Sequence, residues 1–256
     1  MSFRISWPPI AVGVALLALW ETAITAFAVP VYVLPGPLAI GSALVENWAD
    51  LLVGLTVTLQ VTLTALLLAA MSGVAIAVLL AQSQRLEQAL FPYAVILQVT
   101  PIVTVAPFVI IWVSDVFTVL LILAWMAAVF PVLSNTLTGL KSVDVNLREL
   151  FRLYGATRWQ TAVRLSLPSA LPYFLAGLRI SGGLALIGTV VAEMVAGTAG
   201  TQSGLASRLV EASYRLELPR ALACFVLLGA AGVGIYMGLD WFSNRVLRRW
   251  HDSART

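Results

Sequence analysis

Residues 49–81 form an apolar run whose only charged side chain, Asp50, lies near its start. A run of about 20 apolar residues is long enough to cross the hydrocarbon core of a bilayer as a helix. The whole chain has the same character, with 60% hydrophobic and 11% charged residues, whereas soluble domains carry about 25% charged residues. The sequence therefore predicts an all-α integral membrane protein.

About six spans are expected from the alternation of apolar and polar segments. They cover residues 8–28, 49–81, 90–113, 116–140, 173–195 and 221–242. The third contains Pro92, Pro101 and Pro107, and each proline removes a backbone donor, so we expect this span to be kinked or broken. With 256 residues, only short connections remain, which predicts a single transmembrane domain over residues 1–256.

The first apolar run has two interpretations. Ala26-Phe27-Ala28 resembles a signal-peptidase site. The run is longer than a signal core of about 7 to 15 residues, however, and it contains Trp20 and Glu21, so we expect a retained span. The connection that follows, residues 29–50, includes Val-Leu-Pro-Gly-Pro and has no Lys or Arg, so we expect it to face outward.

The basic residues lie in the connections between apolar runs, which is typical of residues that set membrane orientation rather than of a nucleic-acid surface. Three are expected outside: Arg208, Arg215 and Arg220. Eleven are expected inside: Arg4, Arg85, Lys141, Arg148, Arg152, Arg158, Arg164, Arg245, Arg248, Arg249 and Arg255. The excess predicts cytoplasmic termini and a cytoplasmic segment 141–172.

Motifs for catalysis or metal binding are missing from the sequence. Cys224 is the single cysteine and His251, in the tail, is the single histidine, which excludes a disulfide within the chain and a multi-cysteine metal site. Gly139-Leu140-Lys141-Ser142 lacks the spacing of a phosphate-binding loop. We therefore expect no catalytic residues, no metal and no cofactor, and no ATP hydrolysis by this chain.

Residues 141–172 are the longest polar interruption and carry five of the fifteen basic residues. The pairs Asn146/Glu149 and Thr157/Gln160 have capping-box spacing, and Gly155 lies between them. This predicts two short helices separated by a turn, after which Leu167-Pro168 and Leu171-Pro172 should end the second helix and restart another.

The apolar side chains of the first helix recur at helical spacing and form one face: Leu147, Leu150, Phe151 and Tyr154. Such a hairpin could lie on lipid headgroups with its arginines near anionic lipid. It could instead dock a cytoplasmic partner through this apolar ridge. Composition alone does not separate the two interpretations.

The spacing of Glu149, Gly155, Leu165, Leu167 and Pro168 favours docking. It resembles the pattern E-A-A, three residues, G, nine residues, I, one residue, L-P of binding-protein-dependent ABC importer permeases. Leu150 and Phe151 stand where that pattern has alanines, and Leu165 where it has isoleucine. These exchanges keep the apolar character and add bulk, so the partner surface is expected to differ. The resemblance implies that the ATPase-coupling residues are Glu149, Leu150, Phe151, Tyr154, Gly155, Leu165, Leu167 and Pro168.

Residues 33–37, 100–112 and 176–197 are similar to the nitrate, sulfonate and taurine type of permease, whose close relatives import pyrimidine vitamin precursors or riboflavin. The resemblance implies a type I importer fold with a coupling hairpin between spans four and five, in the bacterial inner membrane. It also implies a second permease copy, two ATP-binding subunits and a solute-binding protein. The solute would be a nitrate-, sulfonate- or taurine-like anion, or a pyrimidine or vitamin precursor. A secondary transporter or channel subunit is the alternative, and an intramembrane enzyme is a more distant one.

Two charges in the fifth span, Arg179 and Glu193, need an explanation because a charge within a bilayer is costly. They lie ~21 Å apart along a helix, so they cannot pair with each other. Arg179 could snorkel to the cytoplasmic surface or act in gating, and Glu193 could lie at the outer water interface or in a pathway or dimer interface. Small residues nearby could pack closely or line a pore. The candidate pathway or interface residues are Arg179, Gly183, Gly188 and Glu193.

Overall fold

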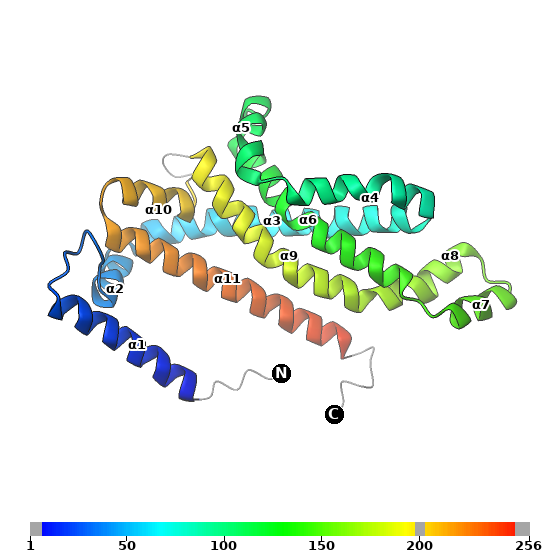
Figure 1. The fold of residues 1–256 in the computed structure, drawn as a ribbon, viewed down its shortest axis with the longest axis horizontal. Coiled ribbons are helices and arrows are strands. Elements are labelled where there is room, and N and C mark those ends of the chain that lie inside the picture. The colour runs from blue at the N-terminus through cyan, green and yellow to red at the C-terminus, as the bar shows by residue number, and fades with distance from the viewer. Residues whose placement is uncertain (1–6, 198–202, 249–256) are drawn as a thin grey trace. The chain divides into compact units, whose positions relative to one another are not determined.

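The computed structural model of the protein describes residues 7–197 and 203–248, and within these ranges the regular structure is entirely helical (Figure 1). Predictions that concern Arg4, Arg249, His251 and Arg255 fall outside the described residues. The elements are α1 (Trp7–Ala26), α2 (Pro37–Glu46), α3 (Trp48–Ala81), α4 (Gln84–Val99), α5 (Ile102–Trp112), α6 (Val116–Lys141), α7 (Val145–Leu153), α8 (Arg158–Thr161), the π-helical turn η1 (Ala162–Ser166), α9 (Leu167–Ala196), α10 (Leu205–Tyr214) and α11 (Leu218–Leu247).

Five of the described helical stretches are long and apolar enough to cross a membrane, and the number is six when the bent pair α4–α5 is counted as one span. This confirms the prediction of about six spans. The match is best for α3 and α6, whose bounds agree to within one residue with the apolar runs 49–81 and 116–140. Both runs are bounded by polar residues, so the sequence locates their ends well.

The third span is broken, as the sequence predicted. The axes of α4 and α5 differ by 97°, and the break falls at Thr100 and Pro101, both in extended conformation. Proline disfavours the helical conformation in the residue before it and has no N–H to continue the helix. Pro92 and Pro107 lie inside helices, so only one of the three prolines ends a helix.

The chain forms two compact units, which we describe separately. The first contains residues 1–57 and 199–229, and the second contains residues 58–198 and 230–256. In the first unit, residues 29–50, expected to be only a connection, include helix α2. Pro37 opens this helix, where its missing N–H costs nothing, and the backbone N–H of Leu38 donates to Glu21 Oε2 of α1 at 3.2 Å.

The second unit is built around the packing of α6 against α9, which lie side by side in Figure 1. Glycines of α9 allow this approach, since a Cβ at Gly177 would lie 2.6 Å from the carbonyl oxygen of Pro131. The hydroxyl of Ser181 donates to the carbonyl of Ala128 at 2.6 Å. The small residues on this face of α9 are therefore used in packing within one chain.

The start of α6 is held by Asp115. Its carboxylate accepts hydrogen bonds from the backbone N–H of Thr118 at 2.8 Å and from the Thr118 hydroxyl at 2.5 Å. These bonds lower the pKa of Asp115, with the hydroxyl contributing most. At the other end of the same unit, α7 and α8 extend beyond the ends of α6 and α9 (Figure 1). This protruding hairpin is the first part of the candidate site.

Candidate functional site

Helix α7 begins earlier than the sequence predicted. Asp144 is its N-cap, and its carboxylate accepts the backbone N–H of Asn146 at 2.7 Å. Asn146 therefore lies in the first turn of the helix, and the capping box expected from Asn146 and Glu149 is wrong. Aspartate ranks with asparagine as a cap, so residue type alone did not distinguish the two positions.

The turn between the two hairpin helices is fixed by Gly155. Its φ is +70°, and the N–H of Ala156 donates to the Phe151 carbonyl while the N–H of Gly155 donates to Arg152, both at 3.0 Å. This is a Schellman motif, in which glycine readily adopts the left-handed conformation. The expected break at Gly155 is confirmed, and the exposed turn gives α7 a defined end.

The second hairpin helix starts with the capping box that the sequence predicted. The N–H of Gln160 donates to the Thr157 hydroxyl at 3.2 Å, and the N–H of Thr157 donates to Gln160 Oε1 at 2.8 Å. Two otherwise unpaired backbone donors are satisfied in this way. Because the Schellman motif and this capping box directly follow one another, the hairpin is an ordered structure.

Several large side chains on this hairpin are exposed. Leu153 is 84% exposed, Tyr154 83% and Trp159 76%. Leu150 is also exposed and Phe151 is half-buried. Exposed apolar side chains that are grouped in this way indicate an interaction site. The predicted ridge of Leu150, Phe151 and Tyr154 is therefore extended by Leu153, which the prediction did not include.

The join between hairpin and membrane differs from the prediction. Leu167-Pro168 and Leu171-Pro172 do not end a helix, because α8, η1 and α9 form one apolar helical stretch, Arg158–Ala196. In η1 the N–H of Leu167 donates to the carbonyl of Ala162, five residues earlier. Such local π-helical adjustments re-satisfy backbone groups around prolines in membrane helices. Leu165 is buried in this turn, whereas Leu167 is exposed and Pro168 is half-buried.

Arg179 has a partner that the sequence analysis missed. Its Nη1 donates to Asp240 Oδ1 at 2.7 Å, and Asn244 Nδ2 donates to the other oxygen of Asp240 at 2.9 Å. Both members of the ion pair are about one-third exposed. The sequence did offer a signal for this partner. Asp240 is an acidic residue in the sixth apolar run, and a charge there is as costly in a bilayer as that of Arg179.

Glu193 is buried within the chain, with 1% of its surface exposed. Its Oε1 accepts the hydroxyl of Thr58 at 2.8 Å, and the hydroxyl of Thr62 donates to Thr189 Oγ1 at 3.0 Å. These contacts join α3 to α9. The alternative that placed Glu193 at a water interface is therefore wrong for the single chain.

The two glycines among the pathway candidates differ in their surroundings. A Cβ at Gly188 would lie 2.8 Å from the Cβ of Ala127 in α6, so this glycine lies at a close helix contact. Gly183 has open space around it and is exposed. Of the four candidates, Gly183 is the one on an exposed face of α9.

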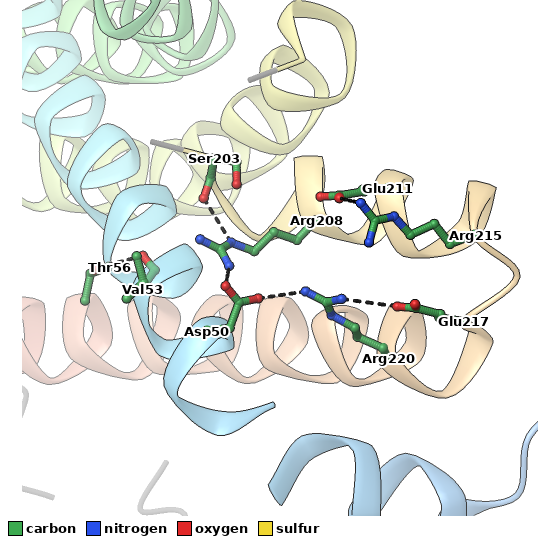
Figure 2. A network of polar contacts seen from close by, with 9 residues as sticks. All are labelled: Asp50, Val53, Thr56, Ser203, Arg208, Glu211, Arg215, Glu217 and Arg220. Carbon is green, nitrogen blue, oxygen red and sulfur yellow. Dashed lines mark hydrogen bonds and ion pairs between the residues drawn. The ribbon is translucent and has the colours of Figure 1, made fainter. Parts of the chain in front are cut away.

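A network of ion pairs lies in the first unit, on the side expected to face outward. Figure 2 shows the carboxylate of Asp50 between Arg208 and Arg220, with Arg220 Nη2 at 2.9 Å. Arg208 Nε donates to the Ser203 carbonyl at 3.1 Å, and Arg220 Nη1 contacts Glu217 at 3.1 Å. Burial, and secondarily the charge of Arg220, lower the pKa of Arg208.

This network gives carboxylate partners to the three arginines that the charge count expects outside. Arg215 pairs with Glu211 at 2.6 Å, so each of the three has a carboxylate partner. Glu211 and Glu217 are near these arginines in the sequence, whereas Asp50 is distant in the sequence and comes from α3. Among the residues that the structure describes, no group of three or more His, Cys, Asp or Glu could hold a metal ion.

Residues 73–252 match the family described as "Binding-protein-dependent transport system inner membrane component". The riboflavin transport system permease protein of Chloroflexus aurantiacus is 31% identical over 98% of this chain and 93% of its own length. The formylaminopyrimidine transport permease protein of Halalkalibacterium halodurans is 30% identical over 91% of each chain. A solved structure, "Crystal structure of an amino acid ABC transporter with histidines", is similar in fold with a TM-score of 0.65, at 18% identity over 79% of this chain and 96% of that chain.

Proposed function

Because the chain belongs to the family of binding-protein-dependent transport system inner membrane components, we propose that residues 141–172 couple it to a separate ATP-hydrolysing subunit. The chain is a permease subunit of an ABC importer for a small solute, and it is a multi-pass protein of the inner membrane. The observation that carries the proposal is the exposed ridge on an ordered hairpin.

The ridge, defined as Leu150, Phe151, Leu153 and Tyr154 with Trp159, has the properties of a docking surface. Large exposed apolar and aromatic side chains contribute most of the binding energy when a partner groove excludes water from them. Glu149 and Gly155 act here as positioning residues, Glu149 on the polar side of α7 and Gly155 at its turn. We propose that Leu165, Leu167 and Pro168 pass the movement of the ridge into α9.

The assembly that we propose contains two copies of this permease, two ATP-binding subunits and a solute-binding protein. Each permease copy is a single transmembrane domain over residues 1–256. Both termini and the hairpin face the cytoplasm, which the distribution of basic residues supports. ATP hydrolysis is assigned to the other subunits because this sequence has no phosphate-binding loop.

For the solute, we propose a nitrogen heterocycle such as a pyrimidine vitamin precursor or a flavin. The riboflavin and formylaminopyrimidine permeases are similar over nearly the full chain, whereas a nitrate import permease of Synechococcus elongatus matches 56% of this chain. Arg179, which could have attracted an anion within a span, is paired with Asp240. Nitrate or sulfonate transport is the second candidate, supported by an aliphatic sulfonates permease of Bacillus subtilis that matches 85% of this chain.

Two experiments test these assignments. Calorimetric titration of the cognate solute-binding protein with riboflavin, formylaminopyrimidine, an aliphatic sulfonate and nitrate identifies the solute class. For coupling, Tyr154→Ala is compared with Tyr214→Ala, which alters an equally exposed tyrosine of α10. Loss of a central interface aromatic costs about 2 kcal/mol or more, so only Tyr154→Ala should release the ATPase subunit during purification. Equal retention by both variants would exclude the ridge as the docking surface.

A further inference from the structure

Three contacts follow one another along α9 and the inner half of α11, defined as residues 230–247. Arg179 is ion-paired with Asp240 at 2.7 Å. A Cβ on Gly182 would lie 3.2 Å from Cγ2 of Ile235, and a Cβ on Gly232 would lie 3.1 Å from Leu186 Cδ2. Because the residue numbers rise on α9 as they fall on α11, the two helices are antiparallel here and closely packed.

The same half of α11 faces α3 across a cavity. A cavity of about 440 Å³ lies between the two helices, and only apolar side chains and glycines line it. The lining residues are Leu59, Leu63, Leu66, Ala231, Gly234, Ile235, Gly238 and Leu239. The inner half of α11 is therefore closely held on its α9 side and loosely packed on its α3 side.

The two contacts differ in what a movement would cost. Separating Arg179 from Asp240, which are each about one-third exposed, would leave two charges within apolar helices without their partner, which is costly in a bilayer. Sliding along an apolar surface has little cost, because lipid tails and apolar side chains offer each other similar contacts. A force on α11 would thus displace it relative to α3 before it separated from α9.

We infer that the inner half of α11 moves together with α9 as one body, locked by the Arg179–Asp240 ion pair, and slides along α3. Arg179 and Asp240 are positioning residues for this movement. The inference rests on the proposed coupling function, since α9 continues from the hairpin without a break and would receive the motion of the ATPase. The pair then extends that motion to α11, which does not directly follow the hairpin or α9 in the chain.

The test measures two distances by pulsed electron spin resonance. Cys224 is replaced by serine, and nitroxide labels are placed on Ile180→Cys and Met237→Cys, or on Leu67→Cys and Met237→Cys. All three labelled side chains are at least half exposed. The complex with its ATPase subunits is reconstituted in nanodiscs, diluted with unlabelled permease, and compared without nucleotide and with ATP and vanadate.

The expected result is a shift of the distance between Leu67 and Met237 and no shift between Ile180 and Met237. Arg179→Ala should produce a shift in the distance between Ile180 and Met237. The double exchange Arg179→Asp with Asp240→Arg should abolish this shift again. Asp240→Asn, which keeps the shape of the side chain, serves if the alanine variant does not fold. A shift between Ile180 and Met237 in the unaltered pair, or no rescue by the exchange, overturns the inference.

Constant distances in both label pairs would also overturn the inference, because α11 would not slide along α3. That outcome leaves the proposed function intact if Tyr154→Ala, but not Tyr214→Ala, releases the ATPase subunit. Equal retention of the ATPase subunit by Tyr154→Ala and Tyr214→Ala would instead show that the coupling assignment is at fault. The two failures are therefore distinguishable.

Discussion

The hydroxyl of Thr58 donates a hydrogen bond of 2.8 Å to the carboxylate of Glu193, 135 residues later in the chain. Both side chains are buried. One turn further along α3 and one turn earlier in α9, Thr62 and Thr189 make a second hydroxyl contact at 3.0 Å. These polar contacts fix how α3 and α9 meet, because a mismatched register would leave buried polar groups unpaired.

Replacing Glu193 by alanine should destabilise the protein. A buried donor that loses its partner costs about 1–3 kcal/mol, so the thermal unfolding midpoint in detergent should fall. Glu193→Gln keeps an oxygen acceptor for Thr58, so its unfolding midpoint should fall clearly less than that of Glu193→Ala. Equal midpoints for the alanine variant and the unaltered protein would show that this contact does not hold the helices together.

Adding a methyl group to Gly188 should have a larger effect than adding one to Gly183. The Cβ at Gly188 would lie 2.8 Å from the Cβ of Ala127 and 3.0 Å from the Cα of Ala124, and overpacking typically costs about 1–3 kcal/mol. At Gly183 no atom lies within 4 Å, so alanine there should be neutral or slightly stabilising through its helix propensity. Thermal unfolding of both variants measures the difference, and a similar loss in both would contradict the proposed packing.

Gly155 should tolerate asparagine better than alanine. At φ +70° a residue with a Cβ is strained by about 1–2 kcal/mol, and asparagine relieves part of this strain by local hydrogen bonding. We expect Gly155→Ala to lower solute uptake per ATP hydrolysed, Gly155→Asn to lower it less, and Glu149→Ala to uncouple the two activities as well. The rates of solute uptake and of ATP hydrolysis are measured on the reconstituted importer with its binding protein. An unchanged ratio of uptake to hydrolysis in the Gly155→Ala and Glu149→Ala variants would contradict a coupling role.

Removing Asp50 should be costly because Arg208 is only 6% exposed. Asp50 itself is 44% exposed, so the cost is that of a buried donor losing its partner, about 1–3 kcal/mol, and Arg220 would lose a contact at the same time. Glu211→Ala breaks the exposed pair with Arg215 in the same helix and should cost only about 0–1 kcal/mol. Unfolding midpoints of the two variants provide the comparison. If the unfolding midpoint of the Asp50→Ala protein is no lower than that of the Glu211→Ala protein, the network has no role in stability.

Features set by local residue order were predictable from the sequence. The long apolar runs gave the spans, and Gly155 and Thr157 gave the hairpin turn, because their conformational preferences act within a few residues. Helix α2 was missed since Pro35 and Pro37 indicate a turn as strongly as a helix start. The π-helical turn was missed because Pro168 and Pro172 predict an interruption, whereas the backbone adjusted around them.

Contacts between distant segments could not be predicted in the same way. The sequence shows that Arg179, Asp240 and Glu193 carry polar groups in apolar surroundings, and each therefore needs a partner. It does not show that Arg179 meets Asp240 rather than another acid, since this depends on the rotation of α9 and α11 about their axes. The position of Asp50 between two arginines is likewise a property of three helices packed together.

The π-helical turn Ala162–Ser166 has a consequence for the engineering of this permease. A turn closed by a bond between residues five apart contains one residue more than an α-helical turn. Deleting one residue within 162–166 would leave ordinary α-helix on both sides, with the ridge and the α6-facing side of α9 still in phase. A one-residue insertion or deletion elsewhere in Arg158–Ala196 would rotate everything on one side of it by about 100°. This short segment is thus the place where chain length can change while the two functional surfaces keep their relative orientation.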